Sequence, residues 1–424
     1  MLIRAYSRLA YPGLWAEDGS IFLQEHLHLG LSAILEPYAG YFHTIPRFLA
    51  FLSASVSLEA FPYFVNVFCI LIAAFAFSTF SATGFRDFLP NDWIRVLASV
   101  TLCFSPGLEE VLANLSNIHW VCYVYLWLLF FSSQSFRISR PEVAFATLCV
   151  FTTGESIVLI PLLSWRVFQA RRMPLRSNLT NFYFLAIILI SITLNMYHSS
   201  SRPLSFDLAE IADTMVFYVT RSFAIDPFMF IFRDLGLQQV LPGPFIHIIG
   251  LLVTLWMVLR IWKFDVRLKV PLILGYGCAF GVPLLTWIVR PGSIDSFDTT
   301  IASDFLHRYS FMMAPFTIIV WFIALSQKTA HDGPLFRRHS NLIFATVVAL
   351  SCLPHFFLRS YKTQDWSAFS QRLMTSKQTC MGQPISMELA PFPAWKLTYD
   401  PLRDKACLYP KQTHSGGETQ RRRP

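Results

Sequence analysis

Charged residues are scarce in this chain of 424 residues, of which 14% are charged and 54% are hydrophobic. A water-soluble domain usually carries about 25% charged residues, so this chain has too little polar surface to cover a soluble globule. Its mean hydropathy of +0.47 fits a lipid bilayer instead. The net charge of +8 does not indicate a nucleic-acid partner, because the basic residues are not clustered on a soluble region.

The common short motifs of soluble catalysis are also missing. The chain contains no C-x-x-C, no G-x-x-x-x-G-K-[ST], no H-E-x-x-H and no G-x-S-x-G. Thioredoxin-like, P-loop, zincin and α/β-hydrolase functions therefore have no support. The two halves show no repeat, which weakens the case for a secondary transporter built from inverted repeats.

Long uncharged stretches dominate what is present, and the six clearest are residues 60–85, 177–201, 235–259, 270–289, 309–327 and 340–358. Each is long enough for the roughly 20 residues of a membrane-spanning helix. Residues 118–135 and the shorter 94–106 are further candidates, and residues 142–153 and 155–168 predict a short helical hairpin that turns at Gly154-Glu155. The sequence predicts an all-α, polytopic integral membrane protein with about 10 membrane segments plus juxtamembrane helices on the outer face.

Three regions follow from this pattern. We expect residues 1–60 to form an outer-face acidic loop with juxtamembrane helices, residues 61–358 to form the transmembrane domain, and residues 359–424 to form an extracytoplasmic tail whose polar, Arg-rich composition predicts a disordered end. The expected location is a bacterial inner membrane.

Lys and Arg in short loops predict the orientation. They gather in residues 86–95, 137–140, 166–176, 260–269 and 328–338. If the hairpin crosses out and back, all five loops lie on one face, which is then cytoplasmic. The opposite face receives most of the unusual polar groups, and we predict a polar cavity that opens outward.

The outer-face groups have different alternative explanations. Charged residues in outer loops are usually only solvated, but Glu155 interrupts an apolar hairpin at a depth where a charge is costly, so it is expected to face a cavity or a partner. His119, beside Trp120, fits an interfacial anchor and a substrate contact equally well.

The segment 11–47 is the most distinctive part of the chain. The adjacent carboxylates Glu17 and Asp18 precede Gly19, and His43 and Arg47 follow near an expected kink at Pro46. Adjacent carboxylates point in different directions, so one can take a proton while the other holds a partner or a cation.

This layout resembles the GT-C superfamily of integral-membrane glycosyltransferases, which use polyprenyl-phosphate-linked sugar donors. The resemblance rests on the order of Glu17-Asp18, the stretch from Tyr38 to Arg47, two following spans, and the hairpin tip Thr152-Thr153-Gly154-Glu155-Ser156. It covers roughly residues 11–358. In that family the acidic loop follows a first transmembrane helix, whereas only Met1 to Leu14 precede Glu17 here, so we expect either that the recorded start is too late or that this member is truncated and inactive.

The resemblance implies an inverting transfer of a sugar from a lipid-phosphate carrier to a glycan, lipid or protein acceptor on the outer face. Asp18, or second Glu17, is the expected general base. The family's Lys-Pro-Pro stretch is missing, so Arg47, Arg221 or Arg308 is expected to stabilise the phosphate. The predicted substrate-binding residues are His43, Arg47, His119, Glu155, Arg221, Arg308 and Tyr309. No cofactor is implied with certainty, although the carboxylates allow a divalent cation.

Two other functions remain open. The outer-face charges also fit the pathway of a transporter or flippase for a lipid-linked or polar solute, and a non-catalytic membrane subunit is the third possibility. In the tail, Cys380 and Cys407 lie outside the apolar segments, and we leave open whether they form a disulfide or remain thiols.

Overall fold

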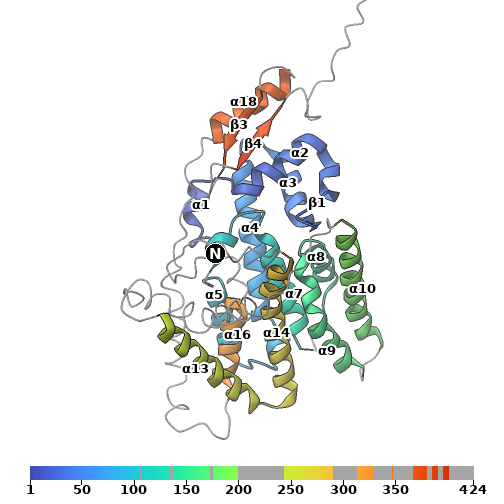
Figure 1. The fold of residues 1–424 in the computed structure, drawn as a ribbon, viewed down its shortest axis with the longest axis vertical. Coiled ribbons are helices and arrows are strands. Elements are labelled where there is room, and N and C mark those ends of the chain that lie inside the picture. Colours follow the sequence, from blue (N-terminus) through green and yellow to red (C-terminus); the bar gives the residue numbers. More distant parts are fainter. Residues whose placement is uncertain are drawn as a thin grey trace, which may run out of the picture.

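The computed structural model describes residues 1–105, 107–133, 138–171, 175–198, 243–289, 313–327, 366–379, 384–389 and 395–400, and the single position 346. Helices dominate these residues, and only two short two-stranded sheets accompany them (Figure 1). The predicted all-α class is therefore correct in its main feature.

The helix α7 (Ile118–Phe131) lies at the centre of the helical bundle. All of its residues are buried, which suits a helix that is apolar on every side. It packs against α4 (Phe61–Ser78), α8 (Arg140–Val150), α9 (Ile160–Ala170) and α14 (Val266–Val289). The core of the protein is therefore built around α7.

Three described helices are long and apolar enough to cross a membrane, namely Phe61–Ser81, Asn178–Tyr197 within α10 (Leu175–His198), and Val266–Leu285. They match three of the six clearest predicted stretches. Of the other predicted segments, α5 (Asp92–Leu102), α7 and α16 (Met313–Ser326) form shorter helices, and α13 (Gly243–Trp262) forms a helix of 20 residues. The described residues therefore contain fewer spans than the about ten segments expected, and the stretch 340–358 lies outside them apart from position 346.

The predicted hairpin is present as two short helices. The helix α8 ends at Val150, the 3-10 helix η5 (Gly154–Leu159) follows the turn, and α9 continues, with a bend of 117° between the two arms. Each arm of 11 residues rises about 16 Å, roughly half the hydrocarbon thickness. The hairpin starts and finishes near one end of the bundle and places its tip toward the other.

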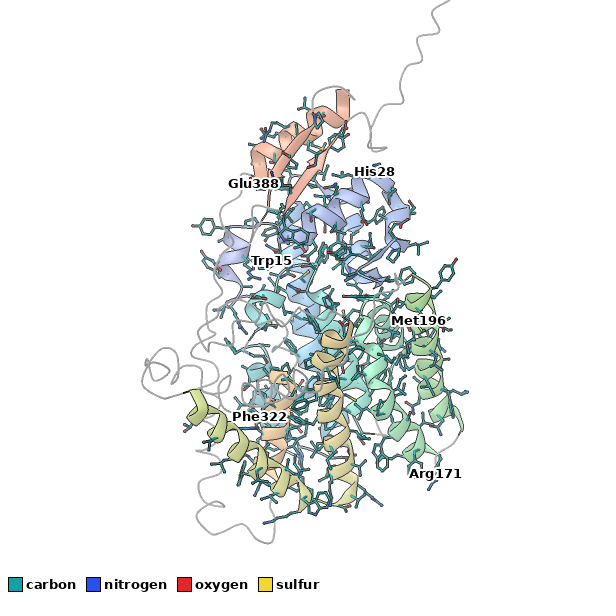
Figure 2. The ribbon with its side chains drawn as sticks, viewed as in Figure 1. Trp15, His28, Arg171, Met196, Phe322 and Glu388 are labelled. Atoms are coloured by element: carbon teal, nitrogen blue, oxygen red, sulfur yellow. The ribbon has the colours of Figure 1, made fainter. Side chains whose placement is uncertain are left out.

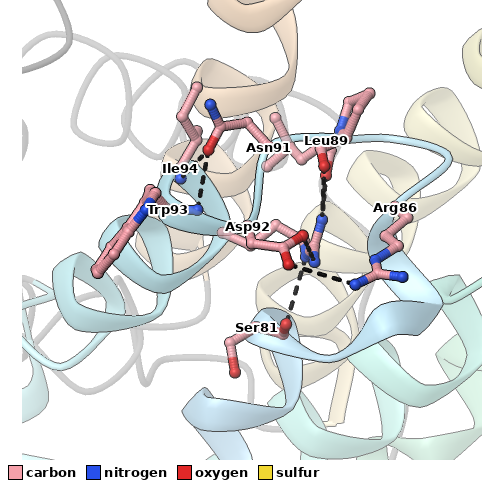
Figure 3. A network of polar contacts seen from close by, with 9 residues as sticks. Ser81, Arg86, Leu89, Asn91, Asp92, Trp93 and Ile94 are labelled. Atoms are coloured by element: carbon pink, nitrogen blue, oxygen red, sulfur yellow. Dashed lines mark hydrogen bonds and ion pairs between the residues drawn. The ribbon is translucent and has the colours of Figure 1, made fainter.

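One end of the bundle gathers arginines that hold backbone carbonyls, which we call the basic end. Arg95 is buried and donates to the carbonyls of Leu89 (2.6 Å) and Ser81 (3.3 Å), and its Nη2 pairs with Asp92 at 2.5 Å (Figure 3). Hydrogen bonding to Arg95 holds the pKa of the Asp92 carboxyl below its usual value. Ser81 lies in η3 (Thr79–Ser81), the continuation of α4, so Arg95 caps the end of that helix.

Direct hydrogen bonds also hold other basic loops at this end of the bundle. Arg166 donates to the carbonyls of Ser132 (2.6 Å) and Leu129 (3.2 Å) at the end of α7. Arg260 donates to the carbonyls of Ala324 (2.6 Å) and Gln327 (3.0 Å) at the end of α16. Gln327 in turn reaches the carbonyl of Phe88. The prediction that the basic loops share one end is confirmed for these loops, and residues 328–338 lie outside the described part.

The opposite end, which we call the acidic end, begins with the N-terminal segment. Its elements are α1 (Tyr6–Ala10), the π-helix η1 (Asp18–Leu23), α2 (Gln24–Leu29), η2 (Gly30–Leu35), β1 (Pro37–Tyr38), β2 (Tyr41–Phe42) and α3 (Thr44–Val56). The expected kink at Pro46 is wrong, because Pro46 lies in the first turn of α3, where its missing N–H leaves no carbonyl unpaired.

The C-terminal segment packs on this acidic end. It consists of α18 (Trp366–Thr379) and the antiparallel pair of β3 (Ile385–Glu388) and β4 (Lys396–Tyr399), which the sequence analysis did not anticipate. The Trp366 indole donates to the carbonyls of Leu58 (3.1 Å) and Glu59 (2.8 Å). Figure 2 shows Glu388, Trp15 and His28 at one end of the molecule and Arg171 at the other.

Candidate functional site

Asp18 lies in the interior of the acidic end, with only 1% of its surface exposed. Its Oδ1 accepts hydrogen bonds from the backbone N–H groups of Leu115 (3.0 Å) and Ser116 (2.8 Å). Its Oδ2 accepts a longer bond of 3.4 Å from the N–H of Trp15. Two backbone donors from a segment about 97 residues away thus fix the carboxylate beside the start of α7.

The loop before α7 is shaped to present those two donors. Ala113 has a positive φ of 62°, an uncommon value outside glycine, which turns the chain sharply. The Asn114 side chain then accepts from the N–H of Asn117 at 2.9 Å and donates to the carbonyl of Glu110 at 2.5 Å. These bonds close the loop on itself and leave the N–H groups of Leu115 and Ser116 for the carboxylate.

Burial changes the acidity of Asp18. Loss of solvation raises the pKa of the Asp18 carboxyl from 3.8 to about 8, against the lowering effect of its backbone hydrogen bond to Ser116, and the neighbouring Glu17 charge adds to the rise. A carboxyl with such a pKa changes its protonation state near neutral pH. That property suits a group that accepts and releases a proton.

Glu17 differs from its neighbour. Its side chain is half-buried, and its Oε2 is covered yet has no hydrogen-bond partner among the described residues. A buried acceptor without a partner costs free energy, of the order of 1–3 kcal/mol. The acidic pair therefore combines one tightly held carboxyl with one that has an unused acceptor.

Two histidines from different elements meet close to this pair. The His119 Nδ1 lies 2.7 Å from the carbonyl oxygen of Ser116, the same residue whose N–H binds Asp18. The His43 ring, at the start of α3, lies perpendicular to the His119 ring with 5.7 Å between centroids. The ring of Phe22, one turn after Asp18, lies with its centroid 5.5 Å from that of the His43 ring. The predicted residues Asp18, His43 and His119 are thus brought together.

Tyr41 connects this cluster to the hairpin tip. The turn at Ala39 and Gly40, with φ of 54° and 93°, joins β1 to β2 and positions the Tyr41 ring 4.2 Å from that of His43. A Cβ on Gly154 would lie 3.1 Å from this ring, so a glycine is needed for the close approach.

The hairpin tip is itself held to the start of α3. The N–H of Ile45 donates to the Thr152 hydroxyl at 3.0 Å, and the Thr44 hydroxyl donates to the carbonyl of Phe151 at 3.1 Å. Glu155 is half-buried and accepts from the Thr153 hydroxyl at 2.7 Å. The structure thus places Glu155 at the acidic end, on the same side as the carboxylate pair.

Arg47 occupies a more structural position than the sequence suggested. It is buried, pairs with Glu25 at 2.5 Å and donates to the carbonyl of Ala33 at 2.9 Å, so it ties α3 to α2 and η2. Its guanidinium also lies 5.6 Å from the centre of the Phe22 ring. Within the part of the chain that the structure describes, its Nε and Nη2 have no hydrogen-bond partner.

The C-terminal hairpin covers the acidic pair from outside the helical bundle. A Cβ on Gly19 would lie 2.7 Å from the Leu389 side chain, so the end of β3 rests directly on the residue after Asp18. The N–H of Thr398 donates to the Gln24 side chain at 3.2 Å. This contact accounts in part for the deep burial of Asp18.

Some predicted groups lie outside the described residues, namely Arg221, Arg308, Tyr309 and both Cys380 and Cys407. The five cysteines that are described are free thiols. Within the described ranges, no group of three or more His, Cys, Asp or Glu side chains is arranged to hold a metal ion.

The sequence analysis missed three contributors to this site: the main chain of Ser116, the ring of Tyr41 and the side chain of Leu389. The two asparagines, Asn114 and Asn117, directly before the long apolar run were the available signal, because asparagine side chains often shape turns. Contacts between segments so distant in sequence leave no local pattern.

Comparison of the chain with known protein families, with characterised proteins and with solved structures gives no match. The residues and geometry of this chain are therefore the basis for inferring its function.

Proposed function

We propose that this protein is a polytopic membrane glycosyltransferase that moves a sugar from a lipid-phosphate carrier to an acceptor at the acidic end, which faces outward. The single observation behind the proposal is the convergence of Asp18, His43, His119 and the hairpin tip, from four separate segments, at one end of a helical bundle. The proposal also includes about ten membrane segments in all, more than the three spans found in the described residues.

The orientation in the membrane follows from the contrast between the two ends. Arginines that cap helix ends gather at the basic end, and short basic loops remain on the cytoplasmic side of a membrane. The acidic pair, the hairpin tip and the C-terminal hairpin then share the outer side. A bacterial inner membrane would supply both the outer aqueous face and lipid-linked sugars.

The carboxylate of Asp18 acts as the general base of the reaction. A hydroxyl of the acceptor attacks the anomeric carbon of the donor sugar, and the bond from that carbon to the phosphate oxygen breaks. The hydroxyl proton passes to the Asp18 carboxylate, and the lipid phosphate leaves with the electron pair of the broken bond. Because the pKa of the Asp18 carboxyl is about 8, Asp18 is a stronger base than an ordinary carboxylate.

The leaving phosphate needs positive charge or hydrogen-bond donors. Arg47 is already paired with Glu25, so Arg221, Arg308 and Tyr309 are the better candidates for this role. Arginine offers two parallel donors to phosphate oxygens, and tyrosine adds a third.

The test uses purified protein in lipid nanodiscs with a set of polyprenyl-phosphate-linked hexoses and pentoses as donors and octyl glycosides as acceptors. Asp18→Asn keeps the shape and the Oδ1 acceptor but removes the base, so we expect release of polyprenyl phosphate to fall at least 100-fold. Glu36→Gln, at an exposed carboxylate of the same end, is the matched control and should stay near the wild-type rate.

Two results would reject the proposal. One is the absence of transfer from every donor by the wild-type protein, with movement of the donor across the bilayer instead, which would favour a flippase. The other is an Asp18→Asn variant that folds normally and transfers sugar at nearly the wild-type rate.

A further inference from the structure

Residues 1–11, which contain α1 and which we call the α1 segment, arrange their side chains in the reverse of the usual order. Helical backbone hydrogen bonds already begin at the Met1 carbonyl. Arg4 and Arg8, four residues apart, share one face of the helix and are only 1% and 4% exposed. The opposite face carries three large apolar side chains that are 60–69% exposed, those of Leu2, Ile3 and Tyr6.

Hydrogen bonds to the bundle fix this orientation. Arg4 donates to the carbonyl of Cys103, directly after α5, and Arg8 donates to the carbonyl of Leu112 in the loop before α7. The side chain of Asn66, in α4, donates to the carbonyl of Arg8 at 2.9 Å. The segment therefore cannot rotate to bring its arginines outward without breaking contacts to several elements.

This arrangement does not suit a helix whose outer face meets water. On a soluble protein, arginine is mostly exposed and the apolar face of a helix turns toward the core. Single exposed apolar side chains are common, but here both arginines face inward while every large side chain on the outer face is apolar. Charged side chains that face the interior of a helical bundle are typical of segments surrounded by lipid.

The height of the α1 segment in the bundle agrees with contact with lipid. From Asn66, which binds Arg8, to the end of α4 at Ser78, the helix rises about 18 Å. Cys103, which binds Arg4, follows α5, whose length from the basic end is about 16 Å. With the basic end at the cytoplasmic surface, both points lie just beyond the midpoint of a hydrocarbon layer roughly 30 Å thick.

The neighbouring helices also expose apolar side chains. The α1 segment packs against α4 on the flank of the bundle (Figure 1). Leu71 is exposed on α4, which is long and apolar enough to span a membrane, and Val96 and Val100 are exposed on α5. The outer face of the α1 segment therefore extends an apolar surface that the bilayer covers under the proposed function.

We propose that the outer face of the α1 segment, formed by Leu2, Ile3 and Tyr6, is a lipid-contact surface embedded in the outer leaflet. The inference rests on the proposed function for the orientation of the bundle and adds the depth of the reaction site. The chain continues from the exposed Tyr11, a residue type that favours the headgroup level, to Trp15, whose N–H binds Asp18. Asp18 then lies near the level that a lipid phosphate occupies.

The experiment measures lipid contact by fluorescence quenching of the full chain in lipid nanodiscs. Tyr6→Cys and, as an independent second reporter, Ile3→Cys are labelled with bimane, and wild-type protein treated in the same way gives the background from the native cysteines. Leu71→Cys, in the apolar span, is the control for lipid contact. Glu388→Cys, at an exposed position of the C-terminal hairpin, is the control for contact with water.

Two quenchers separate the two environments: phosphatidylcholine with a nitroxide near the middle of its acyl chain, and iodide in the aqueous phase. We expect the nitroxide lipid to lower bimane emission about twofold or more at positions 3, 6 and 71 and to leave position 388 unchanged. Iodide should quench position 388 and spare the other three. Lipid quenching at positions 3 and 6 supports the inference even if the protein transfers no sugar, in which case the proposed function alone fails.

The inference alone fails if the nitroxide lipid quenches position 71 but neither position 3 nor position 6. Quenching of those two positions by iodide would then show that the face meets water, and quenching by neither agent would show that protein covers it. If the nitroxide lipid quenches no position, including 71, the membrane assignment is wrong, and the proposed function and this inference fall together.

Discussion

The two ends of the helical bundle use buried charge in different ways. At the basic end, Arg95, Arg166 and Arg260 each bind carbonyl oxygens at the ends of neighbouring segments. At the acidic end, Asp18 also binds the main chain, yet burial still raises its pKa to about 8. Buried arginines at both ends stay charged and are held by main-chain carbonyls, whereas the buried Asp18 carboxyl at the acidic end can change its protonation state.

The difference follows from the chemistry of the two groups. A guanidinium stays charged at any physiological pH and offers five donors, so several carbonyls can satisfy it at once. A carboxyl can escape the cost of burial by taking up a proton. The end that holds the buried Asp18 carboxyl near two imidazoles is therefore the end where proton transfer is feasible, and the basic end is the scaffold that supports it.

The largest expected loss of stability comes from removing a cap at the basic end. Arg166→Met should lower the free energy of unfolding by about 3 kcal/mol or more, because it removes the donor that binds the buried carbonyl of Ser132 and the Asn181 side-chain oxygen. Thermal unfolding in detergent, followed by tryptophan fluorescence, measures the effect.

Arg171→Met is the matched control for that variant. Arg171 is exposed and stacks on the Phe168 ring at 3.9 Å, so its loss should cost less than about 1 kcal/mol. Equal destabilisation by the two variants would show that the basic end is not held together by its buried arginine.

A smaller effect is expected where the C-terminal hairpin rests on the acidic end. Gly19→Ala introduces a methyl group 2.7 Å from the Leu389 side chain, so that side chain must move and loosen the hairpin contact, at a cost of about 1–3 kcal/mol. The C-terminal segment should then be cleaved faster in limited proteolysis.

Gly277→Ala provides the comparison, because a Cβ there has no neighbour within 4 Å. That variant should leave proteolysis unchanged. A Gly19→Ala protein that resists protease as well as the wild type would mean that the hairpin does not depend on its contact with Gly19.

Much of the scaffold could be predicted from the sequence. Uncharged runs located three long apolar helices, and the Gly154-Glu155 break located the hairpin, because helix length and turn residues are local properties. The grouping of basic loops at one end was also accessible, since loop charge alone predicts it.

The details of the site were not accessible in the same way. The sequence selected Asp18, His43 and His119, but it could not show that Ser116 binds both Asp18 and His119, because that contact joins residues far apart. It also could not show that Arg47 pairs with Glu25, which lies 22 residues earlier in a separate helix. The β3–β4 hairpin has strands of four residues, too short for a clear alternating pattern.

The pH dependence of sugar transfer by the wild-type protein tests the role of Asp18 most directly. The base acts only when deprotonated, so a pKa of about 8 predicts a rate that rises with pH, reaches half of its maximum near pH 8 and levels off above it. A rate that is already maximal at pH 6 and does not change up to pH 9 would contradict the assignment of Asp18 as the base.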